Sequence, residues 1–517
     1  MKNSILIHND NVPLKHLFTH NITFKPIGVD IDEYISHELI PKIKELDCQI
    51  IYIKDNLSFN YLELYGLQLI YHIRLSSELG DKQLIPIVLL SDLDSFQLNK
   101  LSSMGRVLFT KNIFITKNSI ESIKKFDLLK IEAFKEKSYQ EKFLNLIEVK
   151  PPRDYLSHHD ISNEWAIYRW SEFLKIQDSK AINENREKIT SMLYFKYLLA
   201  KNPIEIKKKN GIQFIPRPPE NSGKVLYIDD EWNKGWSSIF KKYFSKNNTI
   251  EFKTFEYDFK NNNKFTTLSA IKNYCVKYMP DVVLLDLRLT QSDHQTENIE
   301  TLTGIKIIEI IKEINPAIQI IMLTATGKSE ILENLYKHGV LGYIKKEHPH
   351  DVNINTKDNF DKLKILVDKG LDKKYLKEVW DIQQAIKPFN SDIQIETDSV
   401  FEILNSDMQN KFVYAMFAIF KSIEMVNDYY IIDGYQKAIW KDTNKEFSDN
   451  STKNKIHLIL DKKLNLKDDN INTKLEEIIK IRNNTIHPKK RKSEKINKHH
   501  IITWFKMLQV ILEKIEK

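Results

Sequence analysis

The chain has 517 residues, of which 42% are hydrophobic and 29% are charged, and its formal net charge is +8. This length exceeds what one hydrophobic core supports and predicts roughly three or four globular domains. No apolar run approaches the ~20 residues of a membrane-spanning helix, and the polar start lacks a signal-peptide core. The two cysteines, Cys48 and Cys275, lie in apolar segments, so we expect buried thiols in a cytoplasmic protein. The modest positive charge permits binding to nucleic acid without requiring it.

The first domain is expected over residues 1–125, where short apolar runs alternate with helical patterns. The strand-like runs are "SILIHNDN", "CQIIYIKDNL", "LIPIVLLSDL" and "GRVLFTKNIFI", and "YGLQLIYHIRLS" has helical spacing. Residues 126–220 then read as a helical connector, which ends in the linker "GIQFIPRPPENSGK" with its prolines and glycines. The tryptophans and tyrosines of the connector are interpreted as core or interface anchors.

Residues 221–350 alternate strands and helices most clearly. "KVLYIDDE", "TIEFKTFEYD", "PDVVLLDLRL", "IQIIMLTAT" and "LGYIKK" read as strands, and "TGIKIIEIIKEINP" and "KSEILENLYKHG" as helices between them. The continuous apolar strands are typical of a parallel sheet covered on both faces. We therefore predict a doubly wound α/β domain of the flavodoxin-like kind, with its ligand site at the carboxyl ends of the strands.

Those strand ends carry Asp229 and Asp230, Asp286, Thr324 and Lys346 in that order. The segment resembles a response-regulator receiver domain. The resemblance implies that Mg²⁺ is held by Asp229, Asp230 and Asp286, and that Asp286 accepts a phosphoryl group from a histidine kinase. Thr324 and Lys346 would then bind the phosphoryl oxygens, and the aromatic Tyr343 would change rotamer. Carboxylate and phosphate oxygens are the ligands that Mg²⁺ prefers, and the alternative is a Rossmann-like domain with unrelated strand-end acids.

Two features depart from the receiver pattern. The loop over residues 287–303 is longer than usual and carries Asp293 and Glu297, with Glu300. These acids are expected to slow phosphoryl transfer or to form a docking surface. Glu347 stands where the family has a proline after the lysine. Neither change is expected to remove the Mg²⁺ site.

Residues 1–125 repeat the order of strands and helices of a receiver domain but lack its characteristic acidic residues. Aligned with the later domain, Asn9 and Asp10 replace the acid pair, and Lys54 falls at the acceptor position. A shift of one residue would place Asp55 there instead and would still leave the acid pair incomplete. We interpret this domain as a degenerate receiver that makes contacts, and the alternative is an unrelated small α/β domain.

The remaining chain is predicted to be helical. Residues 351–395 read as a connector, and residues 396–517 as an all-α bundle of four or five helices in which strand signals disappear. "RNNTIH" at residues 482–487 is followed by a basic run. Asn483 and His487 are four residues apart and share one helix face. Pro488 disfavours helix at His487, which is expected where the helix ends.

The bundle with its "RNNTIH" resembles the HEPN superfamily. The resemblance implies a metal-independent endoribonuclease with catalytic Arg482, Asn483 and His487, formed between two protomers of a homodimer. His487 would transfer protons and Arg482 would stabilise the transition state. Six basic residues would bind RNA phosphates: Lys489, Lys490, Arg491, Lys492, Lys495 and Lys498. The alternatives are a solvated loop and a helix-terminal pair in a non-catalytic bundle.

Three functions are compatible with these patterns. The first is a phosphorylation-controlled ribonuclease of a stress or phage-defence pathway, with a histidine kinase and RNA as partners and Mg²⁺ in the receiver. The second is a non-enzymatic signalling adaptor whose bundle binds a protein or dimerises, and a third is a toxin-like bundle silenced by a separate partner. No membrane segment or DNA-binding motif is seen.

Overall fold

The fold was analysed in a computed structural model. It describes residues 3–515, apart from the following: 10–13, 59, 61–62, 128–130, 132–133, 153–157, 205–213, 297, 326–332, 334, 351–354, 387–390, 435–436, 448–450, 467 and 487–494. The chain divides into two compact units. One comprises Met1–Arg217, Asn233–Tyr243 and Lys345–Asp361, and the other comprises Pro218–Trp232, Phe244–Ile344 and Lys362–Lys517.

The first domain is built on a five-stranded parallel sheet in the order β2-β1-β3-β4-β5. Its strands are β1 (Ser4–His8), β2 (His20–Thr23), β3 (Ile50–Lys54), β4 (Ile87–Leu90) and β5 (Ile113–Thr116). Its helices are α1 (Ile31–Tyr34), η2 (Ile35–Leu39), α2 (Ile40–Glu45), α3 (Tyr65–Leu75), α4 (Ser95–Leu101) and α5 (Ile120–Asp127). Short helical turns are η1 (Lys15–Leu17), η3 (Ser77–Leu84) and η4 (Ser103–Phe109). Alternate residues of β3 enter two cores: Ile51 and Ile53 lie with α2 and α3, whereas Tyr52 lies with α5. The sheet is therefore covered on both faces, as predicted.

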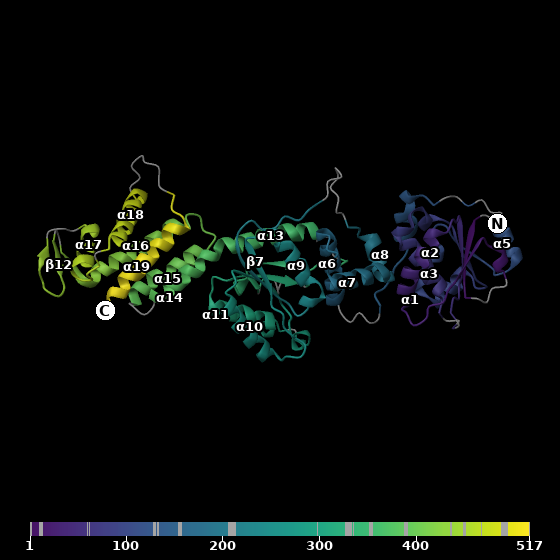
Figure 1. Cartoon of the computed structure of the whole chain (residues 1–517), viewed down its shortest axis with the longest axis horizontal. Helices are drawn as coiled ribbons and strands as arrows, with labels where there is room; N and C mark the ends of the chain where they lie inside the picture. Colours follow the sequence, from purple (N-terminus) through teal and green to yellow (C-terminus); the bar gives the residue numbers. More distant parts are fainter. Residues whose placement is uncertain are drawn as a thin grey trace. The chain divides into compact units, whose positions relative to one another are not determined.

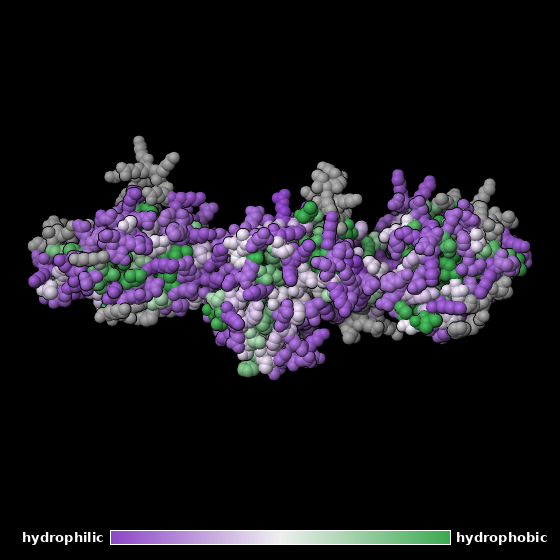
Figure 2. All heavy atoms as spheres, in the orientation of Figure 1, coloured by the Kyte–Doolittle hydropathy of each residue, from purple (hydrophilic) through white to green (hydrophobic). Residues whose placement is uncertain are grey.

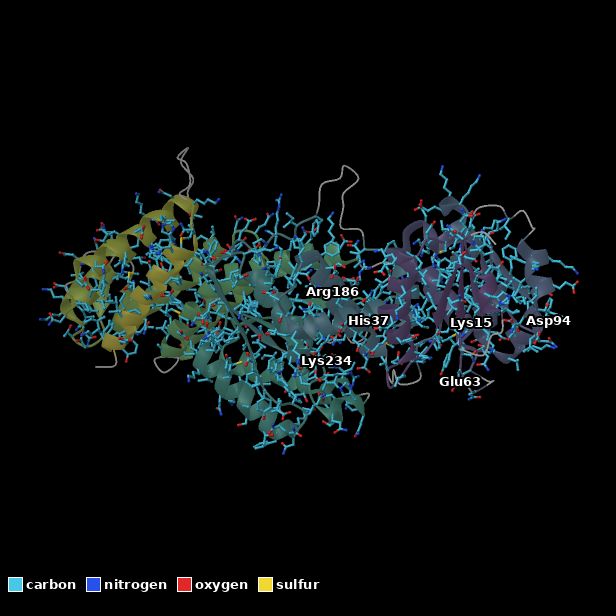
Figure 3. The ribbon with its side chains drawn as sticks, turned by 45° about the vertical axis from the view of Figure 1, so that its right-hand side comes forward. Lys15, His37, Glu63, Asp94, Arg186 and Lys234 are labelled. Carbon is cyan, nitrogen blue, oxygen red and sulfur yellow. The ribbon has the colours of Figure 1, made fainter. Side chains whose placement is uncertain are left out.

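The connector consists of η5 (Glu136–Ser138), η6 (Gln140–Leu144), α6 (His158–Leu174), α7 (Lys180–Ser191) and α8 (Leu193–Lys201). Its α6 and α7 form a helical hairpin (Figure 1). Arg186 of α7 ties the hairpin together, since its Nε lies 2.8 Å from Glu172 of α6 and its Nη2 donates to the Ile176 carbonyl (Figure 3). The buried Phe195 and Leu198 of α8 belong to the core of the first domain, so α8 is anchored there.

The second α/β domain has a sheet in the order β10-β9-β8-β6-β7. Its strands are β6 (Gly223–Ile228), β7 (Ile250–Thr254), β8 (Val282–Asp286), β9 (Gln319–Thr324) and β10 (Gly342–Lys345). Its helices are α9 (Trp236–Phe244), α10 (Lys264–Tyr278), α11 (Thr303–Ile314) and α13 (Thr356–Asp372), with short turns η7 (Trp232–Lys234), η8 (Gln291–His294) and η9 (Ile299–Thr301). α10 and α11 pack on one face of this sheet, where Ile271 and Ile308 meet Leu285 (Figure 1). This architecture confirms the predicted fold.

The C-terminal bundle contains α14 (Leu376–Ile386), α15 (Ser391–Asn405), α16 (Lys411–Tyr430), α17 (Thr452–Lys462), α18 (Asp469–Ile486) and α19 (Lys498–Ile515), preceded by η10 (Lys373–Tyr375). Leu376 and Val379 already belong to its core, so the bundle begins before residue 396. The expectation of a purely helical module was wrong. β11 (Ile431–Gly434), β12 (Lys437–Trp440) and β13 (Glu446–Phe447) form a small antiparallel sheet. The β-branched and aromatic residues around Asp433-Gly434 are a hairpin signal that the long helical pattern of α16 obscured.

The bundle joins the second α/β domain at the amino-terminal ends of its strands. Lys377 of α14 donates to the Met279 carbonyl at 3.1 Å and pairs with Asp281, which directly precedes β8. Ala317, just before β9, is part of the bundle core. Lys498 of α19 reaches Asp372 of α13 at 3.4 Å. The bundle is thus attached at the edge opposite to the strand ends that carry the acids.

Cys48 and Cys275 are buried free thiols, as expected. Hydrophilic residues dominate the visible surface (Figure 2). Among the described residues, none of the helices is long and apolar enough to cross a membrane.

Candidate functional site: a receiver acid cluster and its surroundings

The strand-end acids of the second α/β domain follow or end two adjacent strands, β6 and β8. Asp229 follows β6, Asp286 ends β8, and both are buried, whereas Asp230 is half-buried. One oxygen of Asp229 accepts the Glu231 amide at 2.8 Å, and one oxygen of Asp286 accepts the Arg288 amide at 2.8 Å. These bonds to the following turn hold each carboxylate at the carboxyl edge of the sheet.

The neighbouring acids affect the pKa of Tyr227. It is fully buried on β6, and its pKa is raised well above the usual value. Burial is the main cause, and the negative charges of Asp229, Asp286 and Glu231 add to it. Burial and these negative charges together keep the Tyr227 phenol neutral at physiological pH.

The donor set fits a magnesium ion. Mg²⁺ takes oxygen ligands, keeps several waters and is commonly held by one or two carboxylates together with phosphate. In the part of the chain that the structure describes, no three His, Cys, Asp or Glu side chains form a ready metal cage. Asp229, Asp230 and Asp286 are the carboxylates that would hold the ion, with phosphoryl oxygens and water completing its shell.

The predicted phosphoryl-binding and switch residues occupy the expected strands. Thr324 ends β9 beside β8, where Asp286 pairs with Leu323, and its side chain is buried. Tyr343 lies on β10 and is half-buried. Its ring centre is 3.9 Å from the Lys362 ammonium and 6.3 Å from the Tyr336 ring. An aromatic held between a cation and a second ring has defined contacts to lose when it changes rotamer.

Lys346 and Glu347 follow β10 and are both buried. The Lys346 ammonium lies over the Trp236 ring at 5.5 Å. The structure does not bring Lys346 and Asp286 together within one compact unit, because Lys346 belongs to the first and Asp286 to the second.

Glu347, the residue in place of the family proline, is the centre of a buried network. Its carboxylate pairs with Arg169 of α6 at 2.8 Å. It also accepts the Trp170 indole N–H at 3.2 Å and the Thr356 hydroxyl at 2.9 Å. Burial raises the pKa of Glu347, and the Arg169 guanidinium counteracts this increase. The departure from the family pattern therefore links the residue after Lys346 to the connector.

The long loop is ordered by one of its own acids. Asp293 is buried, and its carboxylate accepts hydrogen bonds from the backbone amides of Leu289, Thr290 and Thr303 at 2.9 to 3.0 Å. The hydroxyls of Thr290 and Thr303 also donate to it. Asp293 thus holds the loop together from inside. It does not belong to an exposed docking surface, which was one of the two roles that we had expected for the acids of this loop. Glu300 lies 3.3 Å from His338, and Glu297 lies outside the described residues.

Strand register supports Lys54 at the acceptor position of the first domain. Lys54 pairs with Leu90, as Asp286 pairs with Leu323. The amide of Gly66 donates to the Asp55 carbonyl, just as that of Gly304 donates to the Leu287 carbonyl, which aligns Asp55 with the residue after Asp286. A Cβ on either glycine would meet these backbones below 3.0 Å, so both helices begin at the same close approach.

The same register corrects the expected position of the acid pair. Ile7 pairs with Ile53, as Ile228 pairs with Leu285, so the positions of Asp229 and Asp230 correspond to His8 and Asn9. Asn9 and Asp10 were expected at these two positions, so the expected alignment was wrong by one residue. Strand pairing, and not the similarity of the residues, determines which positions correspond. Asp10 lies outside the described residues. The Lys54 ammonium donates to the Asn9 amide oxygen at 3.0 Å, so a fixed cation stands at this edge.

The C-terminal motif is described only in part. Arg482 and Asn483 lie in the last turn of α18, and the Arg482 guanidinium donates to Asn483 Oδ1 at 3.1 Å and lies 5.0 Å from the Phe420 ring. Its Nε is buried and has no hydrogen-bond partner among the described residues. Lys495 is exposed, whereas Lys498 pairs with Asp372. His487, Lys489, Lys490, Arg491 and Lys492 lie outside the described residues.

Sequence reasoning missed three residues of these sites: Tyr227, Arg169 and Trp170. Tyr227 resembles any buried strand residue, and only its place two residues before Asp229 could have drawn attention to it. Arg169 and Trp170 lie 178 and 177 positions before Glu347 in the chain. No local pattern connects residues so far apart, so only the fold reveals the network.

Comparisons with known proteins agree with the two α/β domains. Residues 3–116 match the family model of an inactive receiver domain, and residues 252–355 match that of a response regulator receiver domain. The second match begins after β6, but β6 with its acid pair belongs to the same sheet. No curated protein matches the chain.

Parts of the chain also match solved structures of response regulators at low sequence identity. The signal receiver domain of a putative Luxo repressor protein from Vibrio parahaemolyticus is 19% identical, covering 30% of this chain and 94% of that one, with a TM-score of 0.21. NtrX from Brucella abortus is 18% identical, with a TM-score of 0.23, and 40% of this chain matches 35% of NtrX. A LuxR-family response regulator from Aurantimonas sp. SI85-9A1 is 14% identical over 27% of this chain and 86% of that one, with a TM-score of 0.19. The two family models thus identify an inactive receiver domain at residues 3–116 and a response regulator receiver domain at residues 252–355.

Proposed function

We propose that the chain is a response regulator that is phosphorylated at Asp286 and controls the C-terminal bundle. The observation that carries this proposal is the position of Asp229 and Asp286 at the carboxyl ends of the neighbouring strands β6 and β8. A magnesium ion held there would neutralise charge on the incoming phosphoryl group. Thr324, which ends β9 beside β8, is the hydroxyl that would donate to a phosphoryl oxygen.

The transfer needs a nucleophilic oxygen and a good leaving group. An Asp286 carboxylate oxygen attacks the phosphorus of a phosphohistidine on the kinase, the N–P bond breaks, and the imidazole nitrogen takes up a proton. Catalysis is mainly positioning and charge compensation, because the chemistry itself requires little from the protein. The hydrogen bond from the Arg288 amide to Asp286 fixes the direction of the carboxylate.

Intact-mass spectrometry tests the phosphorylation. With Mg²⁺ and acetyl phosphate, the wild-type chain should gain one phosphoryl group, and it should gain none after Asp286→Asn or with excess chelator. Asp55→Asn is the matched control, because Asp55 follows the equivalent strand of the inactive receiver, and this variant should be modified like the wild type. An unmodified wild-type chain under Mg²⁺ would refute the proposal.

The effector activity that we assign to the bundle is metal-independent cleavage of RNA. The support is the placement of Arg482 and Asn483 in the final turn of α18, directly before His487. A guanidinium with a buried, unpartnered Nε among the described residues is suited to accept a phosphate as partner. His487 would transfer the proton of the ribose 2′-hydroxyl, and a second copy of the chain would complete the site.

Incubation of the purified chain with total RNA, with and without acetyl phosphate, tests this activity. His487→Ala and Arg482→Ala should each lower the cleavage rate by ~10²–10³-fold while the chain remains folded. Lys480→Ala is the control, because Lys480 is exposed on the same helix, and its rate should equal that of the wild type. Full activity of His487→Ala would eliminate the mechanism.

A signalling adaptor is the second candidate, and the exposed apolar residues of the bundle favour it. Tyr414 near the start of α16, Tyr429 in its last turn and Ile432 on β11 are all about half exposed, and exposed apolar side chains can mark an interaction surface. The adaptor function predicts no RNA cleavage in either phosphorylation state. It further predicts that Tyr429→Ser weakens self-association measured by analytical ultracentrifugation. Phosphorylation-dependent cleavage by the wild type decides for the ribonuclease.

A further inference from the structure

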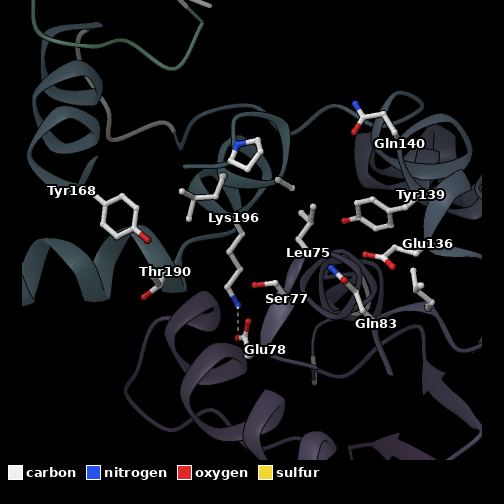
Figure 4. A pocket seen from close by; sticks show the side chains of 14 residues that line it. Leu75, Ser77, Glu78, Gln83, Glu136, Tyr139, Gln140, Tyr168, Thr190 and Lys196 are labelled. Carbon is white, nitrogen blue, oxygen red and sulfur yellow. Dashed lines mark ion pairs between the residues drawn. The ribbon is translucent and has the colours of Figure 1, made fainter. Parts of the chain in front are cut away.

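A cavity in the first compact unit lies outside every site described above. It has a volume of about 820 Å³, which is within the range of small-molecule sites. η3 and the end of α3 supply one wall, and α6, α7 and α8 with residues near η5 and η6 supply the others (Figure 4). The lining combines an apolar floor with polar groups, namely Leu75, Ser77, Glu78, Gln83, Leu84, Glu136, Tyr139, Gln140, Tyr168, Thr190, Lys196, Leu199, Ala200 and Pro203.

Lys196 supplies a buried positive charge to the lining of the cavity. It extends from α8, and its side chain is only 4% exposed. Its ammonium donates to the Ser76 hydroxyl at 2.9 Å, whereas the nearest carboxylate oxygen, on Glu78, is 4.0 Å away (Figure 4). That distance is too long for a hydrogen bond. An ammonium has three donors, so among the described residues this buried cation lacks a full set of partners.

The surroundings reinforce the positive charge. Arg74, one residue before the cavity wall, is fully buried and donates to the carbonyls of Gln83 and Asn112. No carboxylate among the described residues pairs with it. Asp32, a partly buried acid, already accepts hydrogen bonds from Gln68 and the Leu193 amide and pairs with His72. Buried charge is costly unless compensated, so two buried cations with one occupied acid favour an anionic ligand.

We infer that this cavity binds a small organic anion, whose phosphate or carboxylate group contacts the Lys196 ammonium and the Ser76 and Ser77 hydroxyls. The body of the ligand lies between the two tyrosines that point into the space, Tyr139 and Tyr168 (Figure 4). The amide nitrogens of Gln83 and Gln140 already donate to the Arg74 carbonyl and to Asn145 Oδ1, so these side chains offer the ligand their amide oxygens as acceptors. Glu78 is about half exposed and can swing into solvent when the anion arrives.

Burial lowers the pKa of Lys196 to about 8, with Glu78 and Asp32 opposing the shift. The side chain is therefore still protonated at pH 7, and an anion would find a poorly hydrated cation. Such a contact contributes about 1.5–3 kcal/mol, or roughly 10- to 100-fold in affinity. The site is independent of Asp286 and its chemistry. It would give the inactive receiver and the connector a sensory role that needs no phosphorylation.

Thermal unfolding and calorimetric titration of the full chain test the inference. The probes are inorganic phosphate, adenosine and guanosine monophosphate, succinate and citrate. We expect saturable stabilisation by at least one probe. Comparison of the phosphate-containing with the carboxylate-containing probes then identifies the anionic group that the site prefers. Lys196→Met should weaken that binding at least about tenfold. Lys201→Met is the control, because Lys201 lies on the same helix over the Tyr197 ring, and it should bind like the wild type.

Ala200→Trp is the second variant, which fills the cavity without altering its charge and should also abolish binding. The unliganded Lys196→Met chain should unfold at the wild-type temperature or above it, because a buried charge has been removed. If no probe stabilises the wild type at millimolar concentration, the inference is wrong. Equal binding by Lys196→Met and wild type, or unchanged binding by Ala200→Trp, would also overturn it.

Discussion

At the scale of single residues, Glu347 shows how one change in a family pattern can create a new connection. A proline at this position has no polar side chain to offer, whereas the glutamate reaches Arg169, Trp170 and Thr356 at once. The indole of Trp170 also contacts the Trp236 ring, whose face lies beneath the Lys346 ammonium. Lys346, which the receiver resemblance predicts to bind a phosphoryl oxygen, and the connector helix α6 therefore share one packed set of side chains.

Removing the charge of Glu347 should be costly. In Glu347→Gln the Arg169 guanidinium stays buried without its counter-ion, and we expect a loss of about 3–5 kcal/mol in unfolding free energy. Denaturant unfolding followed by tryptophan fluorescence measures it. Glu172→Gln is the matched control, because Glu172 pairs with Arg186 at the same 2.8 Å but is more exposed. That variant should lose at most about 1 kcal/mol.

His72 should make the first unit sensitive to acid. It is fully buried, and burial lowers its pKa from the ordinary value of 6.5. Below pH 6.5 the unfolded chain therefore binds a proton that the folded chain does not, so stability falls as the pH decreases. Unfolding free energies between pH 7.5 and 5.5 should show this slope, and His72→Gln should flatten it. His16→Gln, at an exposed position, should retain the slope.

At the scale of elements, the loop over residues 287–303 is a built structure. Asp293 gathers the amides of Leu289 and Thr290 at one end of the loop and that of Thr303 at the other. It thereby fixes where α11 begins, and Gly304 in the first turn of α11 packs directly on the Leu287 backbone. A loop of this length needs such an internal clamp if it is to leave the adjacent Asp286 in place.

Asp293→Ala should loosen this loop before it affects the rest of the receiver. Several buried donors would lose their acceptor, at a cost of about 3 kcal/mol. Hydrogen exchange at Leu289, Thr290 and Thr303 should accelerate, and acetyl phosphate should modify Asp286 more slowly. Glu300→Ala is the control, since Glu300 lies in the same loop but its side chain is about half exposed and pairs with His338 at the surface. Unchanged exchange in Asp293→Ala would show that the loop has another anchor.

The elements of the receiver were predictable because their signals are local. The apolar strands that lead to Asp229 and Asp286, and the helices between them, could be recognised directly in the sequence. The β11–β13 sheet was missed, because its short strands follow the uninterrupted helical pattern of α16. The register of the first domain was uncertain by one residue until strand pairing placed Lys54 opposite Leu90. The cavity around Lys196 had no sequence signal, since Ser76 lies 120 positions away.

At the scale of the whole molecule, two receivers of one fold have opposite chemistry at the same edge of the sheet. One presents acids, and the other presents the Lys54 ammonium bound to Asn9. We expect only one phosphoryl group per chain. Lys54→Asp should not add a second group, because His8 and Asn9 still stand where metal-binding acids are needed. Intact-mass spectrometry of this variant decides the matter, and a second phosphoryl group would show that the acid pair is dispensable.

The attachment of the bundle at Asp281 sets the physical nature of the signal. β8 separates Asp281 from Asp286, and its five residues span about 16 Å at roughly 3.3 Å per residue. Salt at physiological strength attenuates the field of exposed charges beyond about 8 Å. For the phosphorylation that we propose, the added charge would lie about two such screening lengths from Asp281, so we expect the signal to reach the bundle mainly as a displacement of packed strands and helices. Regulation of the bundle should accordingly be almost indifferent to ionic strength.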